Sequence, residues 1–82
     1  MDTREAQEMM RRVYFERDKA RGVDRTVLRT FQELSELSEK IMEQRNQEEI
    51  AGEMADVFAW ICSLANLLNV DLSKALSEKY GG

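Results

Sequence analysis

The absence of proline is the feature that most constrains how this chain can fold. None of its 82 residues is a proline, and only Gly22 and Gly52 of its four glycines lie away from the last two positions. Because proline and glycine are the residues that interrupt helices, long segments are free to be helical. Apolar residues recur at intervals of three and four, and the alternation typical of strands is missing. The sequence therefore predicts an all-α protein.

Helix boundaries follow from the apolar periodicity and from residues that suit helix ends. Asp2, Asp24, Asn46 and Asp71 are the expected N-caps, because short polar side chains accept hydrogen bonds from the free N–H groups of a first turn. Gly22 is a plausible end for the first helix. No linker or internal repeat is visible, so residues 1–82 are predicted to form a single domain. We expect a four-helix bundle with helices over roughly 3–20, 25–44, 47–69 and 72–80.

The third predicted helix is apolar around most of its circumference, which is typical of a buried helix. A chain of this length buries only a modest core, so part of that burial is expected to come from a second copy in a homo-oligomer. The uncharged stretch 57–70 is shorter than the roughly 20 residues needed to span a bilayer, so no membrane association is expected. The apolar stripe of the third predicted helix consists of Ile50, Met54, Val57, Phe58, Ile61, Leu64, Ala65 and Leu68.

Charge and composition exclude several functional classes. The chain has 16 acidic and 12 basic residues and a net charge of −4, which argues against a nucleic-acid-binding surface. It has no histidine, which excludes Ser-His-Asp and Cys-His catalysis and histidine–zinc sites within one chain. The single cysteine, Cys62, and the polar N-terminus predict a cytoplasmic location.

Two carboxylates stand at the entrance to the most apolar part of the chain. With about 100° of rotation per residue, Glu53 falls between Trp60 and Leu64, inside the apolar arc, and Asp56 falls at its edge. A buried carboxylate is costly unless a cation or a hydrogen-bond donor accompanies it. Simple solvation therefore does not explain Glu53.

The preceding helix repeats the spacing with Glu33 and Glu36, which lie on its polar face and by themselves indicate a solvated surface. Antiparallel packing of the two helices can bring both acidic pairs together. Four clustered carboxylates repel one another unless a cation neutralises them, and oxygen ligands favour Mg²⁺, with Mn²⁺ also possible. Such an ion bridges carboxylates to phosphates, and a spare carboxylate can orient a water.

The pattern Glu33-x-x-Glu36, sixteen residues, Glu53-x-x-Asp56 resembles the MazG-like nucleotide pyrophosphohydrolases of the all-α NTP pyrophosphatase superfamily. The flanking segments "YFERDKARGV" and "EMADVFAWICSLANLLNVDLSKAL" are also similar to that family. The resemblance implies a helical bundle that forms a homodimer or homotetramer. It also implies Mg²⁺-dependent hydrolysis of a (deoxy)nucleoside triphosphate to the monophosphate and pyrophosphate.

Carried over by position, the resemblance implies that the four carboxylates hold the metal, and that Glu36, with Glu33, helps to position the attacking water. Lys74 and Lys79 are candidates for the phosphates, although each is also explained as a surface lysine. Trp60 is a candidate for stacking on the base, or a core residue. The segment "RDKAR" suits either phosphate contact or a helix end. Gln32 stands where relatives often have a further glutamate.

Two other interpretations remain open from the sequence. One is a related activity in the same superfamily, such as that of a phosphoribosyl-ATP pyrophosphohydrolase. The other is a non-catalytic helical module for oligomerisation or regulation, which would keep the fold with a degraded site. The four intact acids favour an enzyme, and Gln32 slightly favours the non-catalytic module.

Overall fold

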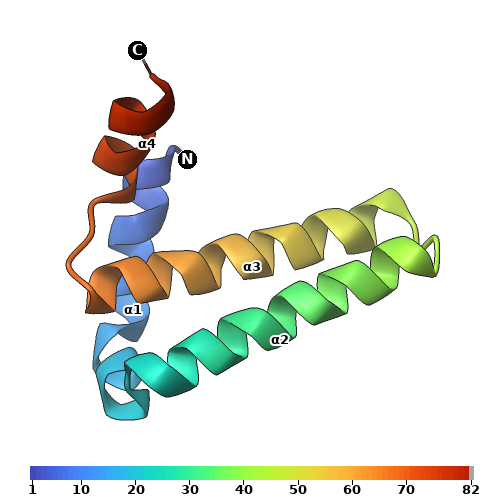
Figure 1. The fold of residues 1–82 in the computed structure, drawn as a ribbon, viewed down its shortest axis with the longest axis horizontal. Helices are drawn as coiled ribbons and strands as arrows, with labels where there is room; N and C mark the ends of the chain where they lie inside the picture. The colour runs from blue at the N-terminus through green and yellow to red at the C-terminus, as the bar shows by residue number, and fades with distance from the viewer. Residues whose placement is uncertain (82) are drawn as a thin grey trace.

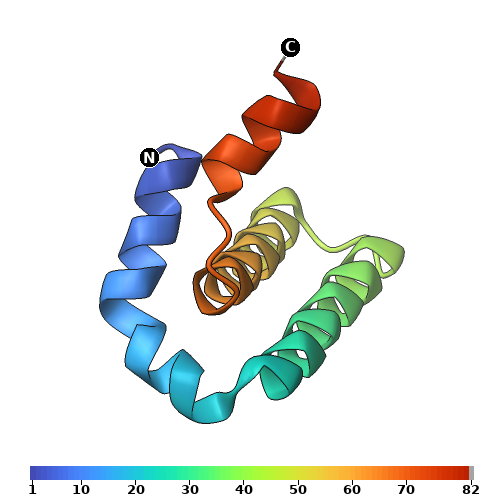
Figure 2. The same cartoon turned by 60° about the vertical axis from the view of Figure 1, so that its left-hand side comes forward.

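The computed structural model describes residues 1–81, and within them the chain is helical throughout apart from short connections. The helices are α1 (Thr3–Arg21), α2 (Val23–Met42), α3 (Gln47–Leu67) and α4 (Leu72–Tyr80). Helices α2 and α3 form a long antiparallel hairpin, and α1 crosses one end of it (Figure 1). Turning the molecule shows α3 between α1 and α2, with α4 beside the N-terminal part of α1 (Figure 2). The all-α prediction is confirmed.

Three of the four predicted N-caps are confirmed. The carboxylate of Asp2 accepts a hydrogen bond from the Glu5 amide at 2.8 Å, and Asp71 accepts one from the Lys74 amide at 3.0 Å. The side chain of Asn46 accepts a bond from the Glu49 amide at 2.9 Å. These bonds satisfy backbone donors that have no partner within their own helix.

The prediction for Asp24 is wrong, because α2 begins before it. Gly22 is both the C-cap of α1 and the N-cap of α2, with φ 90° and ψ 162°. This backbone conformation is accessible essentially only to glycine, so one residue is enough to turn the chain from α1 into α2. Asp24 instead lies in the first turn of α2, where its charge suits the helix dipole.

Helices α2 and α3 each end two residues earlier than the periodicity predicts. Gln44 and Asn69 have φ of 57° and 56°, and each stands just past its helix in the left-handed region. The amide one residue further on then reaches back: Arg45 bonds the carbonyl of Lys40 at 3.0 Å, and Val70 that of Ala65 at 2.8 Å. This is the Schellman arrangement, which closes a helix by satisfying its last carbonyls.

Helix α3 is the central element, since it packs against both α1 and α2. It contributes most of the buried residues, including Cys62, which is fully buried, and burial raises the pKa of its thiol. Asn66 joins α3 to α1 by accepting a bond from Gln7 Nε2 at 3.0 Å. By length and composition alone α3 could cross a membrane, and the core helix of a soluble protein meets the same criteria.

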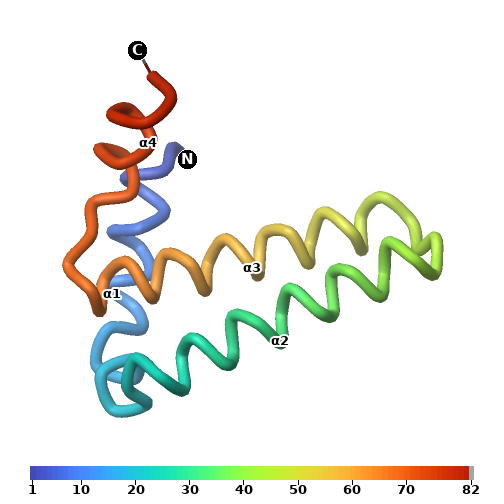
Figure 3. Tube along the Cα trace, viewed as in Figure 1, coloured from blue at the N-terminus to red at the C-terminus, as the bar shows by residue number. Residues whose placement is uncertain are grey.

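Two helical faces remain apolar and exposed. The face on α2 includes Val27, Leu28, Phe31 and Leu34. The face on α3 includes Met54 and Ile61, seven residues apart, and continues to Leu68 at the C-cap of the helix. Phe31 is 72% exposed, whereas Leu37 is the one residue of α2 that counts among the buried apolar side chains. The path of the chain in Figure 3 shows that α1 and α4 lie at one end of the hairpin, so the rest of α2 and α3 is covered only by each other.

Candidate active site

Three of the four predicted metal ligands meet where α2 and α3 run side by side. Glu33 comes from α2, and Glu53 and Asp56 come from α3. One carboxylate oxygen from each of the three lies within 4.8 Å of the others. The antiparallel pairing predicted from the sequence therefore brings the two acidic motifs together, and we call these three residues the acidic cluster.

The two glutamates of the acidic cluster are largely withdrawn from solvent. The side chain of Glu53 is 11% exposed and that of Glu33 is 12% exposed, whereas Asp56 is exposed. Burial of Glu53 agrees with its place in the apolar arc. The expectation that Glu33 lies on a solvated face is wrong, because α3 packs over that side of α2.

Lys40 supplies the cation that the buried Glu53 needs. Its Nζ donates to Glu53 Oε1 at 2.7 Å. The other oxygen, Glu53 Oε2, is buried and has no hydrogen-bond partner within residues 1–81. A buried carboxylate oxygen without a donor is unfavourable, so this atom is suited to a ligand that the protein itself does not provide.

The surroundings of Glu33 disfavour its charged form. Burial is the largest cause of its raised pKa, followed by the charges of Glu36, Glu53 and Asp56. Arg29 Nη2 lies 3.6 Å from Glu33 Oε1 and offsets this only in part. The acidic cluster thus carries more negative charge than the nearby cations balance.

Glu36 lies beside the acidic cluster rather than within it. It is exposed, one helical turn from Glu33, and close enough for its side chain to contribute to the raised pKa of Glu33. Gln32 is also exposed and accepts a bond from Arg29 Nη1 at 3.0 Å. The structure therefore brings three of the four predicted acids together and leaves Glu36 beside them.

The donor set fits a hard divalent cation. All candidate ligands are carboxylate oxygens, the type that Mg²⁺ and Mn²⁺ prefer. The unpartnered Glu53 Oε2 and the raised pKa of Glu33 both fit a site that a cation would stabilise. Glu33, Glu53 and Asp56 would hold such an ion.

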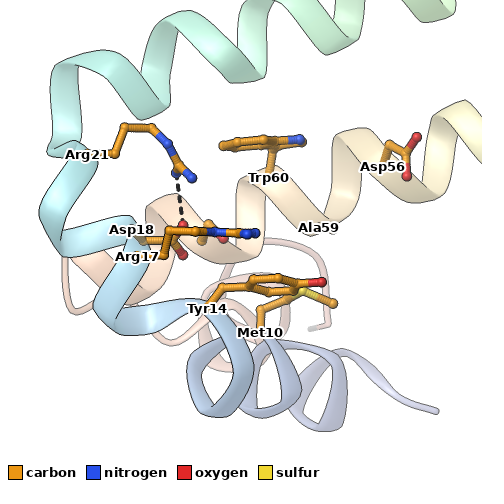
Figure 4. Close-up of a pocket in the computed structure, with 9 residues that line it drawn as sticks. Met10, Tyr14, Arg17, Asp18, Arg21, Asp56, Ala59 and Trp60 are labelled. Carbon is orange, nitrogen blue, oxygen red and sulfur yellow. Dashed lines mark hydrogen bonds and ion pairs between the residues drawn. The ribbon is translucent and has the colours of Figure 1, made fainter.

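A pocket of about 190 Å³ adjoins the acidic cluster, and Asp56 belongs to both. Its walls are formed by α1 and α3, and its closed end lies at the corner between α1 and α2 (Figure 4). Trp60 and Tyr14 provide the largest apolar surfaces, and charged side chains surround them. The lining residues are Met10, Tyr14, Arg17, Asp18, Arg21, Asp56, Ala59, Trp60 and Ser63.

Trp60, predicted as a possible base-stacking residue, lines this pocket, and two arginines lie near its ring. The guanidinium carbon of Arg21 is 4.7 Å from its ring centroid, and that of Arg29 is 5.2 Å away. Arg29 also faces Glu33, so it connects the pocket with the acidic cluster. Guanidinium groups in this position suit the negative charge of a phosphate chain.

Lys74 and Lys79 lie apart from this region. Both are exposed on α4, where Lys74 is 3.9 Å from Glu78 and Lys79 lies 5.4 Å from the ring centroid of Tyr80. Neither lines the pocket beside the acids. Helix α4 packs on α1, so the structure does not bring these lysines to the acidic cluster.

Sequence reasoning missed Asp18 and Lys40 as parts of the site. Asp18 is 2% exposed and stands in "RDKAR". The sequence indicates only phosphate contact or a helix end for this segment. Lys40 is seven residues after Glu33, two helical turns along the same face. That spacing is the one sequence feature that indicates a position for Lys40 near the acids.

Comparison with known proteins agrees with this geometry. The family model of the MazG nucleotide pyrophosphohydrolase domain matches residues 21–81, which include all of α2, α3 and α4 and both acidic motifs. No curated protein matches the chain. The matched region is most of the chain, and we conclude that the chain belongs to the MazG nucleotide pyrophosphohydrolase domain family.

Proposed function

We propose that this protein is a Mg²⁺-dependent nucleoside triphosphate pyrophosphohydrolase that converts a (deoxy)nucleoside triphosphate into the monophosphate and pyrophosphate. The observation that supports this most is the convergence of Glu33, Glu53 and Asp56 beside a pocket, with Glu53 Oε2 left unpartnered. Family membership supports the reaction class.

In this proposal the acidic cluster, Glu36 and Arg29 have different roles in the reaction. Mg²⁺ held by the acidic cluster would polarise a phosphoryl oxygen and offset the charge of the carboxylates. Glu36, at the solvent boundary, orients a water and accepts its proton as the water oxygen bonds to the α-phosphorus. The bond from the α-phosphorus to the bridging oxygen then breaks, and pyrophosphate leaves with that oxygen. Arg29, between Glu33 and Trp60, is placed to face the departing phosphates.

We also propose that the protein works as a homo-oligomer, a dimer or a tetramer. The exposed apolar faces of α2 and α3 support this, because burying them against a second copy would add to a small core. The faces belong to the same two helices that carry the acidic cluster, so association would also hold those helices in place.

The proposed reaction is tested by incubating the protein with Mg²⁺ and a panel of NTPs, dNTPs and phosphoribosyl-ATP, and measuring pyrophosphate. We expect release from at least one nucleoside triphosphate. Glu53→Gln should lower the rate by roughly 100-fold or more, since even groups behind a metal ligand are worth 10- to 100-fold. Glu78→Gln, at an exposed site on α4, is the matched control and should leave the rate unchanged.

Turnover of phosphoribosyl-ATP alone would move the assignment to that related activity. If no substrate releases pyrophosphate, and calorimetry detects no Mg²⁺ binding, the enzyme assignment is wrong and a non-catalytic module is the remaining interpretation.

A further inference from the structure

The pocket beside the acidic cluster has the form of a slot between two aromatic rings. Tyr14 of α1 and Trp60 of α3 both line it, and in Figure 4 their rings are seen nearly edge-on with a space between them. The side chain of Arg17 lies in that space, and its guanidinium carbon is 4.6 Å from the Tyr14 centroid. Arg17 is exposed, so its side chain can turn out into solvent and a flat ligand can take its place against the Tyr14 ring.

A buried carboxylate stands at the closed end of this slot. Asp18 is 2% exposed, and its Oδ1 accepts a hydrogen bond from Arg21 Nη1 at 2.9 Å. Its second oxygen, Oδ2, is buried and has no hydrogen-bond partner in the described part of the chain. An ionised carboxylate oxygen can only accept hydrogen bonds, so the group that satisfies it must be a donor.

The slot and the acidic cluster are neighbours along α3. Asp56 and Trp60 are one turn apart on α3, about 6 Å along the helix axis. Because Asp56 belongs to both the pocket and the acidic cluster, a base between Tyr14 and Trp60 would leave the rest of its nucleotide close to those acids. Aromatic rings stack on any base, so the stacking itself does not select among them.

We propose that this slot binds the nucleobase and that Asp18 selects bases carrying an exocyclic amino group, such as cytosine and adenine. This inference rests on the proposed function, because it names the substrate class of the same site. An amino group donates to Asp18 Oδ2, whereas the carbonyl at the same position of uracil or hypoxanthine places an acceptor against an acceptor. A site that hydrogen-bonds a ligand group discriminates strongly against the analogue that lacks it.

The test uses Trp60 as its probe, because it is the chain's one tryptophan. Its fluorescence is titrated, without metal, with CMP, UMP, AMP and IMP. CMP and UMP form one pair, and AMP and IMP form the other. Within each pair the amino group of the first member is a carbonyl in the second, and the neighbouring ring nitrogen gains a hydrogen. We expect CMP to bind about tenfold or more tightly than UMP, and AMP to exceed IMP similarly.

The variant Asp18→Asn replaces one acceptor by an amide that can donate. This variant should abolish or reverse the preference for CMP over UMP and for AMP over IMP. If Asp18 had a purely structural role, its loss would lower the affinity for all four nucleotides equally. Asp24→Asn, at an exposed site on α2, is the matched control and should keep the wild-type order. Circular dichroism shows whether each variant is folded, and the wild-type comparison needs no variant at all.

Equal affinities within both pairs, no binding of any of the four, or an unchanged preference in Asp18→Asn would each overturn the role of Asp18. These titrations involve neither hydrolysis nor metal. An active enzyme without base preference would therefore leave the proposed reaction standing, and selective binding by an inactive protein would leave the base site standing.

Discussion

Glu33 and Lys40 together determine the charge balance of the metal-free protein. Glu33 is surrounded by three other acids, and Lys40 is the ammonium group that pairs with Glu53 among them. The pairing raises the pKa of Lys40, chiefly through its hydrogen bond to Glu53, so this cation stays charged. It neutralises one carboxylate and leaves the repulsion around Glu33 in place.

Glu33 should make the stability of the metal-free protein depend on pH. Its pKa in the folded protein lies above the ordinary value of 4.5, mainly because of burial, so the folded state holds this proton more tightly than the unfolded state. The stabilisation is present at low pH and is lost as the pH rises through the raised pKa. We expect the melting temperature, measured with EDTA, to rise as the pH is lowered from neutral towards that window.

The variant Glu33→Gln keeps the side chain's shape and removes its titration, so this part of the pH dependence should disappear. Glu78→Gln, on the exposed surface of α4, should retain it. A Glu33→Gln profile parallel to that of the wild type would contradict the assignment to Glu33.

At the scale of elements, the corner between α1 and α2 determines the shape of the pocket beside the acidic cluster. Asp18 and Arg21 precede this corner, and Thr26 follows it, with its hydroxyl donating to the Gly22 carbonyl at 2.8 Å. Arg21 Nη1 also reaches Thr26 Oγ1 at 3.4 Å. The conformation of Gly22 therefore sets where the closed end of the pocket lies relative to α3.

Gly22→Ala should destabilise the protein by about 1–3 kcal/mol, because a side chain at φ 90° and ψ 162° is strained even though no atom would contact the added Cβ. Gly52→Ala is the matched control. Gly52 lies within α3 with open space around it, so alanine there should stabilise the protein by about 1 kcal/mol. Chemical denaturation measures both changes, and two effects of the same sign would contradict this explanation.

At the scale of the whole molecule, the chain buries few large apolar side chains for its length. Leu37, Cys62 and Ala65 are its buried apolar residues, whereas Phe31, Leu28 and Met54 are more than half exposed. Such a distribution is typical of a subunit whose apolar faces meet another subunit. We therefore expect the proposed oligomer to stabilise the fold as well as to support the function.

Phe31→Lys should shift the protein towards smaller assemblies, because it places a charge in the middle of the exposed apolar face of α2. Phe31→Leu keeps that face apolar and serves as the control. Light scattering coupled to size-exclusion chromatography measures the mass of each. A wild-type protein that is monomeric at all concentrations, or an unchanged mass for Phe31→Lys, would contradict the proposal.

Much of the local structure follows from short-range rules. Asp2, Asn46 and Asp71 cap helices as expected because a cap bond involves residues only three apart. The ends at Gln44 and Asn69 were missed because left-handed closure by a residue other than glycine has little signal in the sequence. The start of α2 was missed because Asp24 has the side chain typical of an N-cap, whereas the actual N-cap is Gly22, two residues earlier.

The sequence by itself determined that the chain is helical and that Glu53 is buried, because helical periodicity places side chains around an axis. Only the tertiary structure decided that Glu33 is withdrawn from solvent, that Lys40 pairs with Glu53, and that Asp18 ends a slot beside Trp60. These facts depend on how α1, α2 and α3 pack, and interhelical packing is set by side chains that are far apart in the sequence.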